Sequence, residues 1–406
     1  MYNFSKKTIL VQLGPLHLCQ TTGLPLIECL SKENRVIIYA PRSLENEKWL
    51  RDQCHRFPKN KVCWYSDRNS HELFFLKQEI RQLSAFVDAL FIPNHSWPIN
   101  QVLIHSVKKL NPLCNIIVYQ NGKFDTSNGA EDQIRRDTEI ARAFPKLSLY
   151  SKLAWLFNLI FSIYYKLINF YFFRLLPLIY FGKFFSPPCN FKTGKYSSSG
   201  IKQFNALNSV FYFYDDVALD YARKIGFKNA KHEMHPVSKL SPKEINNIFG
   251  FERNHEQKSN VTEIVILPSW GFTSAAEIRN QPDIIANSWL EVISLLKMKY
   301  DNPSISIKLH PNAKDDPLWK ITCQKLNQEA SVAIIESSES AEALVLRSDV
   351  ICGDISSILL WASFFPKKHI ISFDLFHLNG ADEFAPYSKI DFYNRDRLNF
   401  ELSQIG

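Results

Sequence analysis

A short basic stretch in the last third of the chain has the residue types of an anion-binding site. Residues 305–309 alternate apolar and polar side chains, which predicts a strand, and His310 and Pro311 follow it directly. Pro311 ends the strand and fixes its own φ, so we expect His310 to lie at the carboxyl edge of a sheet. A cation from His310 or Lys308 at that edge can neutralise a phosphate. A positioned cation also lowers the barrier when a leaving phosphate gains negative charge.

A second set of polar residues, about 45 positions further on, has the pattern of a phosphate-binding turn. Residues 348–360 read as a strand, a tight turn and the start of a helix, with Ser356 and Ser357 at the helix start. Hydroxyl groups and free backbone amides at that place favour an anion. A third loop, residues 268–271, follows an earlier strand and contributes Ser269. Each motif alone is common by chance, whereas their joint placement on strand ends of one parallel sheet predicts a single phosphate site.

These loops can meet only if a parallel sheet of alternating strands and helices carries them. The C-terminal region has that rhythm, because short β-rich runs alternate with amphipathic stretches. The expected strands are 263–267, 304–309, 332–335, 350–352 and 369–373, and the expected helices are 282–299, 317–327, 341–347 and 358–364. Strands separated by one helix each favour a doubly wound parallel sheet that binds its ligands at the carboxyl ends of the strands.

The first 125 residues show the same rhythm. The expected strands are 8–13, 36–39, 62–65, 89–92 and 116–119, and the expected helices are 44–56, 72–83 and 101–110. A further strand is expected at 210–214 and a helix at 217–225. Asp215 and Asp216 stand between them, where carboxylates cap a helix start, with metal ligation as the alternative.

The length of the chain indicates two domains. With 406 residues it exceeds the ~250 to 300 residues at which a single hydrophobic core stops growing. We therefore expect an α/β protein with Rossmann-like domains at residues 1–240 and 263–406. The intervening residues 241–262 are polar and charged, which is typical of a linker.

Residues 149–185 interrupt the rhythm with an aromatic and basic segment. Lys152, Lys166, Arg174 and Lys183 leave no uncharged run of about 18 residues, so a membrane-spanning helix is disfavoured. Aromatic rings with interspersed cations suit a helix that lies on an anionic membrane surface. A pair of buried helices, or a contact between subunits, is the alternative, and both interpretations are open.

Composition and cysteine spacing narrow the class of protein. Hydrophobic residues at 46% and charged residues at 22% exclude a mainly disordered chain. The net charge of +8 fits an anionic partner such as a nucleotide phosphate, an acidic glycan or an anionic lipid surface. Eight cysteines without zinc-ligand spacing read as reduced thiols of a cytosolic protein, and the apolar run near the N-terminus is too short for a signal peptide.

The motifs Lys308-Leu309-His310-Pro311 and Asp354-Ile355-Ser356-Ser357 resemble the His-Pro and Ser-Ser motifs of bacterial sialyltransferases and polysialyltransferases of capsule and lipopolysaccharide synthesis. They are also similar to those of CDP-glycerol glycerophosphotransferases. The resemblance covers about the last 140 residues well and the first 240 in outline. It implies the GT-B fold, in which an N-terminal acceptor domain and a C-terminal donor-nucleotide domain face one another across a cleft. It further implies that His310 binds or protonates the donor phosphate and that Ser356 and Ser357 hold it.

The acceptor side departs from the sialyltransferase pattern. That family carries an acidic pair followed by Gly at the end of an N-domain strand, whereas this sequence has Gln120-Asn121-Gly122 at the similar place. Neither amide can accept a proton, and an inverting displacement needs a general base. We rank His17, in the loop after the first strand, and Asp125 ahead of His95 as the base.

These features predict a glycosyltransferase with a donor phosphate site. The resemblance further implies an inverting enzyme that moves a sialic-acid-like nonulosonic acid from a CMP-activated donor to a glycan or lipid-linked glycan. We expect a cytoplasmic protein at the inner membrane face, an anionic membrane surface as a partner, and no nucleic-acid partner. We also expect no cofactor and no metal, because Lys308, His310 and the helix start can neutralise the leaving phosphate. The alternatives are a CDP-glycerol or CDP-ribitol phosphotransferase and a catalytically silent partner of a polysaccharide assembly complex.

Overall fold

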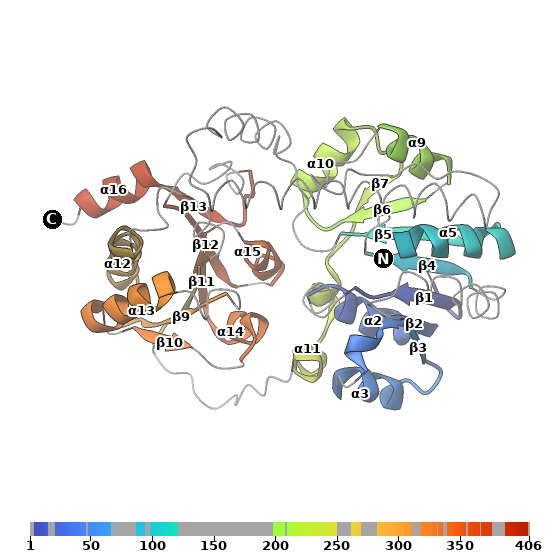
Figure 1. Cartoon of the computed structure of the whole chain (residues 1–406), viewed down its shortest axis with the longest axis horizontal. Helices are drawn as coiled ribbons and strands as arrows, with labels where there is room; N and C mark the ends of the chain where they lie inside the picture. The colour runs from blue at the N-terminus through green and yellow to red at the C-terminus, as the bar shows by residue number, and fades with distance from the viewer. Residues whose placement is uncertain are drawn as a thin grey trace, which may run out of the picture. The chain divides into compact units, whose positions relative to one another are not determined.

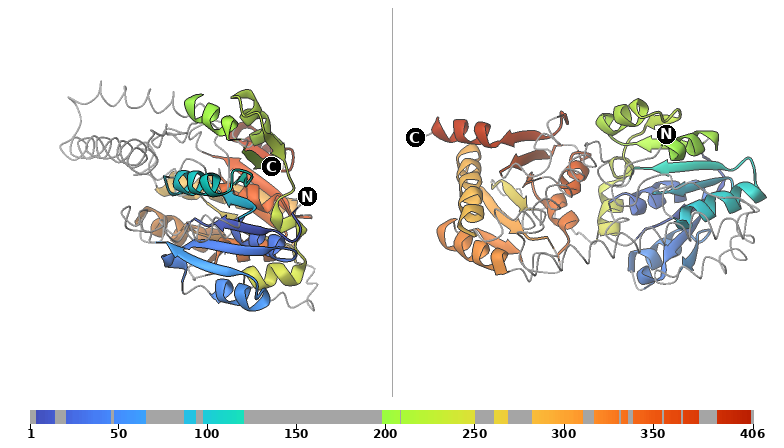
Figure 2. Two further views of the ribbon diagram at one scale, coloured as in Figure 1. Left: turned by 90° about the vertical axis from the view of Figure 1, so that its right-hand side faces the viewer. Right: turned by 45° about the horizontal axis from the view of Figure 1, so that its top comes forward.

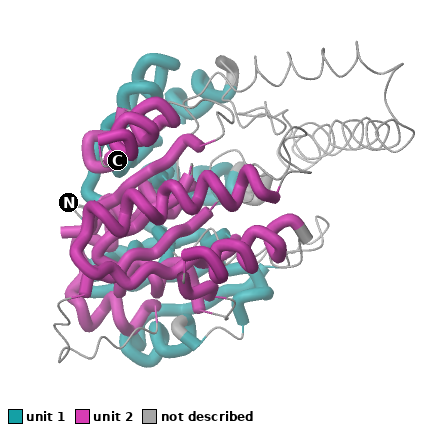
Figure 3. The backbone as a smooth tube through the Cα atoms, turned by 90° about the vertical axis from the view of Figure 1, so that its left-hand side faces the viewer, with its two compact units in different colours: residues 1–234 teal, residues 235–406 magenta. Residues whose placement is uncertain are grey.

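The chain forms two compact units, Met1–Met234 and His235–Gly406 (Figure 3). We describe each unit by itself, from a computed structural model. The residues described are 4–14, 21–45, 48–65, 87–93, 98–120, 198–207, 209–249, 261–268, 282–310, 317–330, 332–335, 339–354, 356–365, 367–375 and 386–404.

Within the described residues, the first unit is built on a seven-stranded sheet in which all neighbouring strands are parallel (Figure 1). Its strands are β1 (Thr8–Gln12), β2 (Arg35–Pro41), β3 (Lys61–Tyr65), β4 (Ala89–Ile92), β5 (Asn115–Tyr119), β6 (Val210–Phe213) and β7 (Ala230–His232). Their order is β3-β2-β1-β4-β5-β6-β7. The direction of winding reverses between β1 and β4, and such a reversal is where open α/β sheets bind ligands, at the carboxyl ends of the strands.

Helices and buried aromatic rings fix the β6 side of this sheet. The helical elements of the unit are α2 (Gly23–Ser31), η1 (Arg42–Leu44), α3 (Lys48–Arg56), α5 (Pro98–Leu110), α9 (Ser198–Ala206) and α10 (Asp216–Lys224). Phe211 of β6 is stacked on Phe213 with ring centroids 4.1 Å apart. Phe204 of α9 and Phe227, which follows α10, contact the ring of Phe211. This cluster anchors α9 and the end of α10 on β6 and so holds the strand whose carboxyl end carries Asp215.

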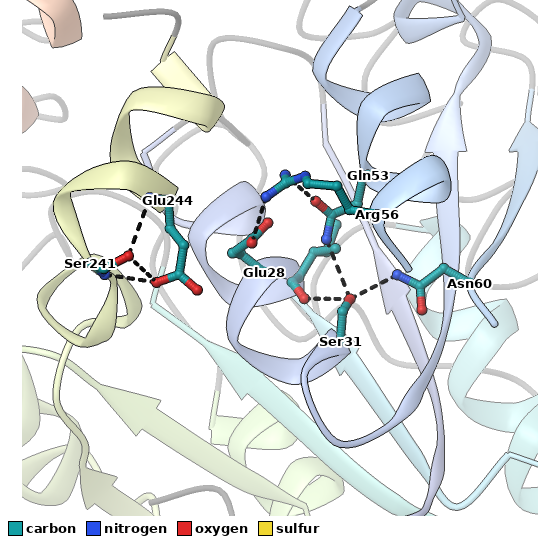
Figure 4. Close-up of polar contacts among 8 residues, drawn as sticks. Glu28, Ser31, Gln53, Arg56, Asn60, Ser241 and Glu244 are labelled. Carbon is teal, nitrogen blue, oxygen red and sulfur yellow. Dashed lines mark hydrogen bonds and ion pairs between the residues drawn. The ribbon is translucent and has the colours of Figure 1, made fainter. Parts of the chain in front are cut away.

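A polar network holds α2 and α3 together (Figure 4). Arg56 forms an ion pair of 2.7 Å with Glu28, whose side chain is 2% exposed, and it also donates to Gln53. The hydroxyl of Ser31 accepts hydrogen bonds from Gln53 and Asn60. Because a buried carboxylate is costly without a partner, the ion pair with Arg56 stabilises the charge of Glu28.

The second unit repeats the same plan. Within the described residues its sheet has six parallel strands, β8 (Glu263–Leu267), β9 (Ser304–Lys308), β10 (Ala333–Ile335), β11 (Val350–Gly353), β12 (His369–Asp374) and β13 (Asp391–Asn394). Their order is β10-β9-β8-β11-β12-β13, so the winding reverses between β8 and β11. Both units therefore have the strand order of a Rossmann-like sheet.

Helices cover both faces of the second sheet (Figures 1 and 2). The helical elements are η5 (Pro236–Lys239), α11 (Pro242–Phe249), α12 (Pro282–Lys299), α13 (Pro317–Ala330), α14 (Ala341–Arg347), α15 (Ser357–Ala362) and α16 (Arg395–Ser403). Helices α12 and α13 lie on one face and α14 and α15 on the other. Trp289 and Trp319, fully buried, fill the core between the sheet and α12 and α13.

The first residues of the second unit pack on α15. The buried ring of His235 stacks on Phe364 with centroids 4.5 Å apart, and burial lowers the pKa of His235 to about 3. Phe249 at the end of α11 contacts Trp361 of α15 at 5.4 Å. Residues 235–249 are therefore tied to the helix that begins at the predicted phosphate site.

The predicted α/β architecture is confirmed. Strands β4 and β8 and helices α12 and α14 have the predicted bounds, and the other predicted elements within the described residues differ by a few residues at their ends. The N-cap role of Asp215 is confirmed, because its side chain accepts a hydrogen bond from the amide of Ala218. The helix predicted at 72–83 and the aromatic segment 149–185 lie outside the described residues.

The division at 240 and 263 stays a prediction. Along the chain, the first compact unit ends at Met234 and the second begins at His235. Part of the expected linker forms α11. Ser241 and Glu244 close the start of this helix with reciprocal hydrogen bonds (Figure 4). No described helix combines the length and the apolar character that a bilayer crossing requires.

Candidate functional site

Three neighbouring strands of the second sheet end at its carboxyl edge. Strand β9 ends at Lys308 and is followed by His310, and β11 ends at Gly353 and leads to Ser356. Strand β8 lies between β9 and β11 and pairs with both. The end of β9, with Lys308 and His310, and the turn before Ser356 therefore lie on either side of β8, the strand that precedes Ser269. The winding of the sheet reverses between β8 and β11, where such sheets bind ligands.

The turn between β11 and α15 depends on a close approach of two strands. Gly353 is the register partner of Leu267, and a Cβ at position 353 would lie 2.6 Å from the carbonyl oxygen of Leu267. Ser356 is the N-cap of α15, and its hydroxyl oxygen accepts from the amide of Ile358 at 3.4 Å. Ser357, the first residue of the helix, is exposed. Hydroxyls and free backbone amides at a helix start of this kind favour an anion.

The charges at this edge have opposite signs. Lys308 is half-buried and His310 is exposed, whereas Asp354, directly after β11, is 8% exposed. Partial burial lowers the pKa of His310 below its ordinary value, so the free protein favours the neutral imidazole. A phosphate close to the ring favours the imidazolium instead. Binding of an anion is therefore expected to be coupled to uptake of a proton by His310.

Four of the predicted site residues, Lys308, His310, Ser356 and Ser357, belong to this edge. Their assignment as phosphate ligands stays a prediction. Ser269, His17, Asp125 and His95 lie outside the described residues, so their roles also stay predictions.

The carboxyl edge of the first sheet carries a pair of side chains that the sequence did not suggest. Gln120, directly after β5, donates from Nε2 to Oδ2 of Asp215 at 2.6 Å. Both side chains are buried, with residue exposures of 3% and 7%. These residues are 95 positions apart, so only the pairing of β5 with β6 reveals the contact. The amide that stands at the expected place of an acid is thus hydrogen-bonded to a carboxylate.

Comparison with known proteins defines the fold. No protein-family model matches the sequence, and no curated protein matches it. A solved structure from Listeria monocytogenes, described as a candidate UDP-N-acetylglucosamine 2-epimerase, has a TM-score of 0.55 at 8% identity over 99% of this chain and 87% of its own. A glycosyltransferase from Rickettsia africae has a TM-score of 0.50 at 12% identity over 99% and 90%. The fold is GT-B.

The GT-B fold alone leaves the reaction open, because these two structures carry different enzyme names on one architecture. A sialyltransferase from Photobacterium damsela also matches, with a TM-score of 0.48 at 13% identity over 95% of this chain and 81% of its own, a likeness too distant to support an inference. The reaction has to be inferred from the side chains at the two sheet edges.

Proposed function

We propose that this chain is an inverting glycosyltransferase that transfers a sialic-acid-like nonulosonic acid from a CMP-activated donor to a glycan acceptor in capsule or lipopolysaccharide synthesis. The observation that carries the proposal is the arrangement of the second sheet, where the ends of β9 and β11 flank β8 at the point of reversed winding. The residues at those ends, Lys308, His310, Ser356 and Ser357, are donors and cations suited to a phosphate. The nature of the nucleotide and sugar rests on the resemblance of these motifs to sialyltransferases.

The proposed chemistry follows from the charge that develops on the donor. As the bond between the anomeric carbon and the phosphate oxygen breaks, its electron pair moves to the phosphate, which becomes more negative. The imidazolium of His310 and the ammonium of Lys308 stabilise that charge, and the hydroxyls of Ser356 and Ser357 donate hydrogen bonds to the phosphate oxygens. The acceptor oxygen attacks the opposite face of the anomeric carbon and gives up its proton to a base. On this proposal neither a metal nor a cofactor takes part.

The central test uses the purified full-length chain with CMP-sialic, CMP-pseudaminic and CMP-legionaminic acids and a panel of oligosaccharide acceptors. We expect CMP release and a glycoside product with at least one donor. The variant His310→Ala should lose about 10²- to 10³-fold in kcat, the usual effect of removing one group that stabilises transition-state charge. Asn394→Ala, which removes the cap of α16 after β13, serves as a control substitution at another strand end of the same sheet. Failure of all three donors to release CMP would contradict the proposal.

Product analysis separates the alternatives. A phosphodiester product with release of CMP from CDP-glycerol or CDP-ribitol would indicate a phosphotransferase of the teichoic-acid type. Epimerisation of UDP-N-acetylglucosamine, included because of the fold shared with the Listeria structure, would indicate an epimerase. Unchanged glycan output in cells that carry His310→Ala would favour a catalytically silent assembly partner.

We further propose that the protein acts at the cytoplasmic face of the membrane, where residues 149–185 contact anionic lipid. The aromatic and basic composition of this segment supports the proposal. Flotation with vesicles of phosphatidylglycerol and phosphatidylethanolamine should retain the protein, and replacement of Lys152, Lys166, Arg174 and Lys183 by Ser should release it. Absence of binding would favour buried helices instead.

A further inference from the structure

A buried carboxylate lies at the carboxyl edge of the first sheet, beside the end of β5. Strands β5 and β6 are hydrogen-bonded neighbours, with Tyr119 opposite Tyr212. Gln120 follows β5, and Tyr214 and Asp215 follow β6. This is the edge at which parallel sheets bind their ligands.

Three hydrogen bonds fix the orientation of the two side chains. The amide of Tyr214 donates to Oε1 of Gln120 at 2.8 Å, so Nε2 of Gln120 must point to Asp215. Oδ1 of Asp215 accepts from the amide of Ala218 at 2.7 Å, and Oδ2 accepts from Nε2 of Gln120 at 2.6 Å. The carboxylate therefore has a defined position and receives one hydrogen bond on each oxygen. Each oxygen keeps a further lone pair that can accept a proton.

The surroundings make Asp215 a stronger base than an ordinary aspartate. Burial raises the pKa of Asp215, and the hydrogen bonds from Ala218 and Gln120 oppose that shift in part. Of the neighbouring charges, Asp216 raises the pKa further and His232 lowers it. Glu233, directly after β7, is the third carboxylate at the described strand ends on this side. A raised pKa moves a carboxyl group toward the range in which it works as a general base near neutral pH.

The other two carboxylates fit this role less well. The side chain of Asp216 is 83% exposed and lies 3.8 Å from the imidazole of His232, so it is solvated and lacks the burial that distinguishes Asp215. Oε1 of Glu233 accepts from the amide of the next residue, Met234, at 3.3 Å, and β6 separates Glu233 from the end of β5. Asp215 combines burial with hydrogen bonds from the end of β5 and from the start of α10.

We propose that Asp215 is the general base that takes the proton from the acceptor hydroxyl. The inference rests on the proposed transferase function. The acceptor O–H proton passes to a carboxylate oxygen of Asp215, and the freed electron pair forms the bond from the acceptor oxygen to the anomeric carbon. The bond from that carbon to the donor phosphate breaks with its electron pair on the phosphate oxygen. Asp215 then returns the proton to water.

The first variant, Asp215→Ser, removes the carboxylate and keeps a cap. A serine hydroxyl can accept from the amide of Ala218, since Ser and Asp are equally good N-caps, and it can also accept from Gln120. We expect kcat/KM to fall about 10²- to 10⁴-fold, the usual contribution of a general base. The fall of activity at low pH, which reports protonation of the base, should disappear in this variant.

A second variant exchanges the two side chains. Gln120→Glu with Asp215→Asn keeps the same three hydrogen bonds. The new carboxylate accepts from Tyr214, and the side-chain amide introduced at position 215 donates to that carboxylate while its oxygen caps Ala218. The exchange moves the carboxylate to the end of β5. This variant should exceed Asp215→Ser in kcat/KM by at least about tenfold and regain the fall of activity at low pH. If Asp215→Ser does not fold, the folded exchange variant decides: activity supports the inference, and inactivity contradicts it.

Asp216→Asn is the matched control, because it removes the adjacent exposed carboxylate, and it should keep the activity of the wild type. Full activity of Asp215→Ser with an unchanged pH profile would show that Asp215 only caps α10, and the transferase function would stand. Loss of activity in Glu233→Gln, together with an active Asp215→Ser, would assign the role to Glu233. A wild type that releases CMP from no donor would overturn both the function and the base.

Discussion

The close approach of β8 and β11 gives a sharp test of the proposed phosphate site at the carboxyl edge of the second sheet, which we call the donor edge. In Gly353→Ala the new Cβ would lie 2.6 Å from the carbonyl oxygen of Leu267 and 3.5 Å from Cδ2 of Leu359. Real Cβ contacts essentially never fall under 3.0 Å, so the two strand ends must separate by at least 3.0 − 2.6 = 0.4 Å. Because the blocking atom belongs to the backbone, no side-chain rotation can relieve the contact.

The expected cost follows from that displacement. Insertion of a methyl group into a close-packed place typically costs about 1 to 3 kcal/mol. For a domain of this size, each kcal/mol lowers Tm by about 2 to 4 °C. The shift also moves the end of β8 and the end of β11, which leads to Ser356. We therefore expect Gly353→Ala to weaken CMP binding by about tenfold, which corresponds to about 1.4 kcal/mol of the strain acting on the bound state.

Differential scanning fluorimetry and calorimetric titration with CMP measure the two effects separately. Gly226→Ala is the matched control, because Gly226 has φ of +107° at the end of α10 and strains any L-residue placed there. It should lower Tm and leave CMP affinity unchanged. CMP binding of Gly353→Ala at wild-type affinity would refute the assignment of the donor phosphate to this edge.

Donor affinity should fall as pH rises, because the pKa of free His310 is lowered and a bound phosphate raises it. The contribution of His310 to donor affinity is complete at a pH below its pKa in the free protein, and it is lost at a pH above its pKa in the complex. Titration with CMP in buffers of different ionisation enthalpy should show proton uptake, which His310→Ala should abolish; equal uptake in that variant contradicts the role. Arg56→Met should lower the free energy of unfolding by about 3 kcal/mol, the lower end of the range for a broken buried pair because the Arg56 side chain is 30% exposed, and Glu28→Gln in the same chain should recover part of that loss. No recovery would mean that packing of Arg56 matters more than its charge. Ser356→Ala and Asn394→Ala should each cost about 1 kcal/mol as lost caps, and only Ser356→Ala should weaken CMP binding, whereas equal binding of the two would remove Ser356 from the site.

Elements with a regular local pattern were predictable from the sequence. Helix α2 has no such pattern and was not predicted. The sequence around Gly23 and Pro25 suggests a break, since Gly and Pro disfavour helix interiors. In the structure Pro25 lies in the first turn, where its missing N–H costs nothing, and Leu26, Ile27 and Leu30 are buried. Burial against the sheet therefore outweighs the unfavourable propensity. That packing is not encoded in the segment itself.

Short edge strands were missed for a related reason. Strand β7 has three residues, and β13 begins at Asp391, whose carboxylate forms ion pairs with Lys299 and Arg397. Neither strand has the apolar alternation that marks a half-buried strand. Each one forms because β6 or β12 offers a free edge with hydrogen-bonding groups. The neighbouring strand, rather than the residues of the segment itself, therefore decides whether the strand exists.

The donor edge could be outlined from the sequence because its parts are local. His310 lies two residues after β9, and Ser356 lies three residues after β11, so each strand, loop and polar group is contiguous. Their common edge then follows from the parallel order of the sheet. The close spacing that requires Gly353 could not be predicted in this way, because its contact with Leu267 joins two strands.

The carboxyl edge of the first sheet, where we propose that the acceptor is deprotonated, could not be outlined from the sequence. Compared position by position, Gln120 indicates a lost acid, and that absence is what suggests a catalytically silent protein. The sheet places Asp215 2.6 Å from the amide of Gln120 although 95 positions separate the two residues. Exchange of the amide and the carboxylate between the two positions would preserve the hydrogen bonds to Tyr214 and Ala218, so either strand end could carry the charge within the same network. A carboxylate is therefore needed at one of the two neighbouring strand ends, and it need not belong to the motif after β5. That pair still has one, which supports an active enzyme over a silent partner.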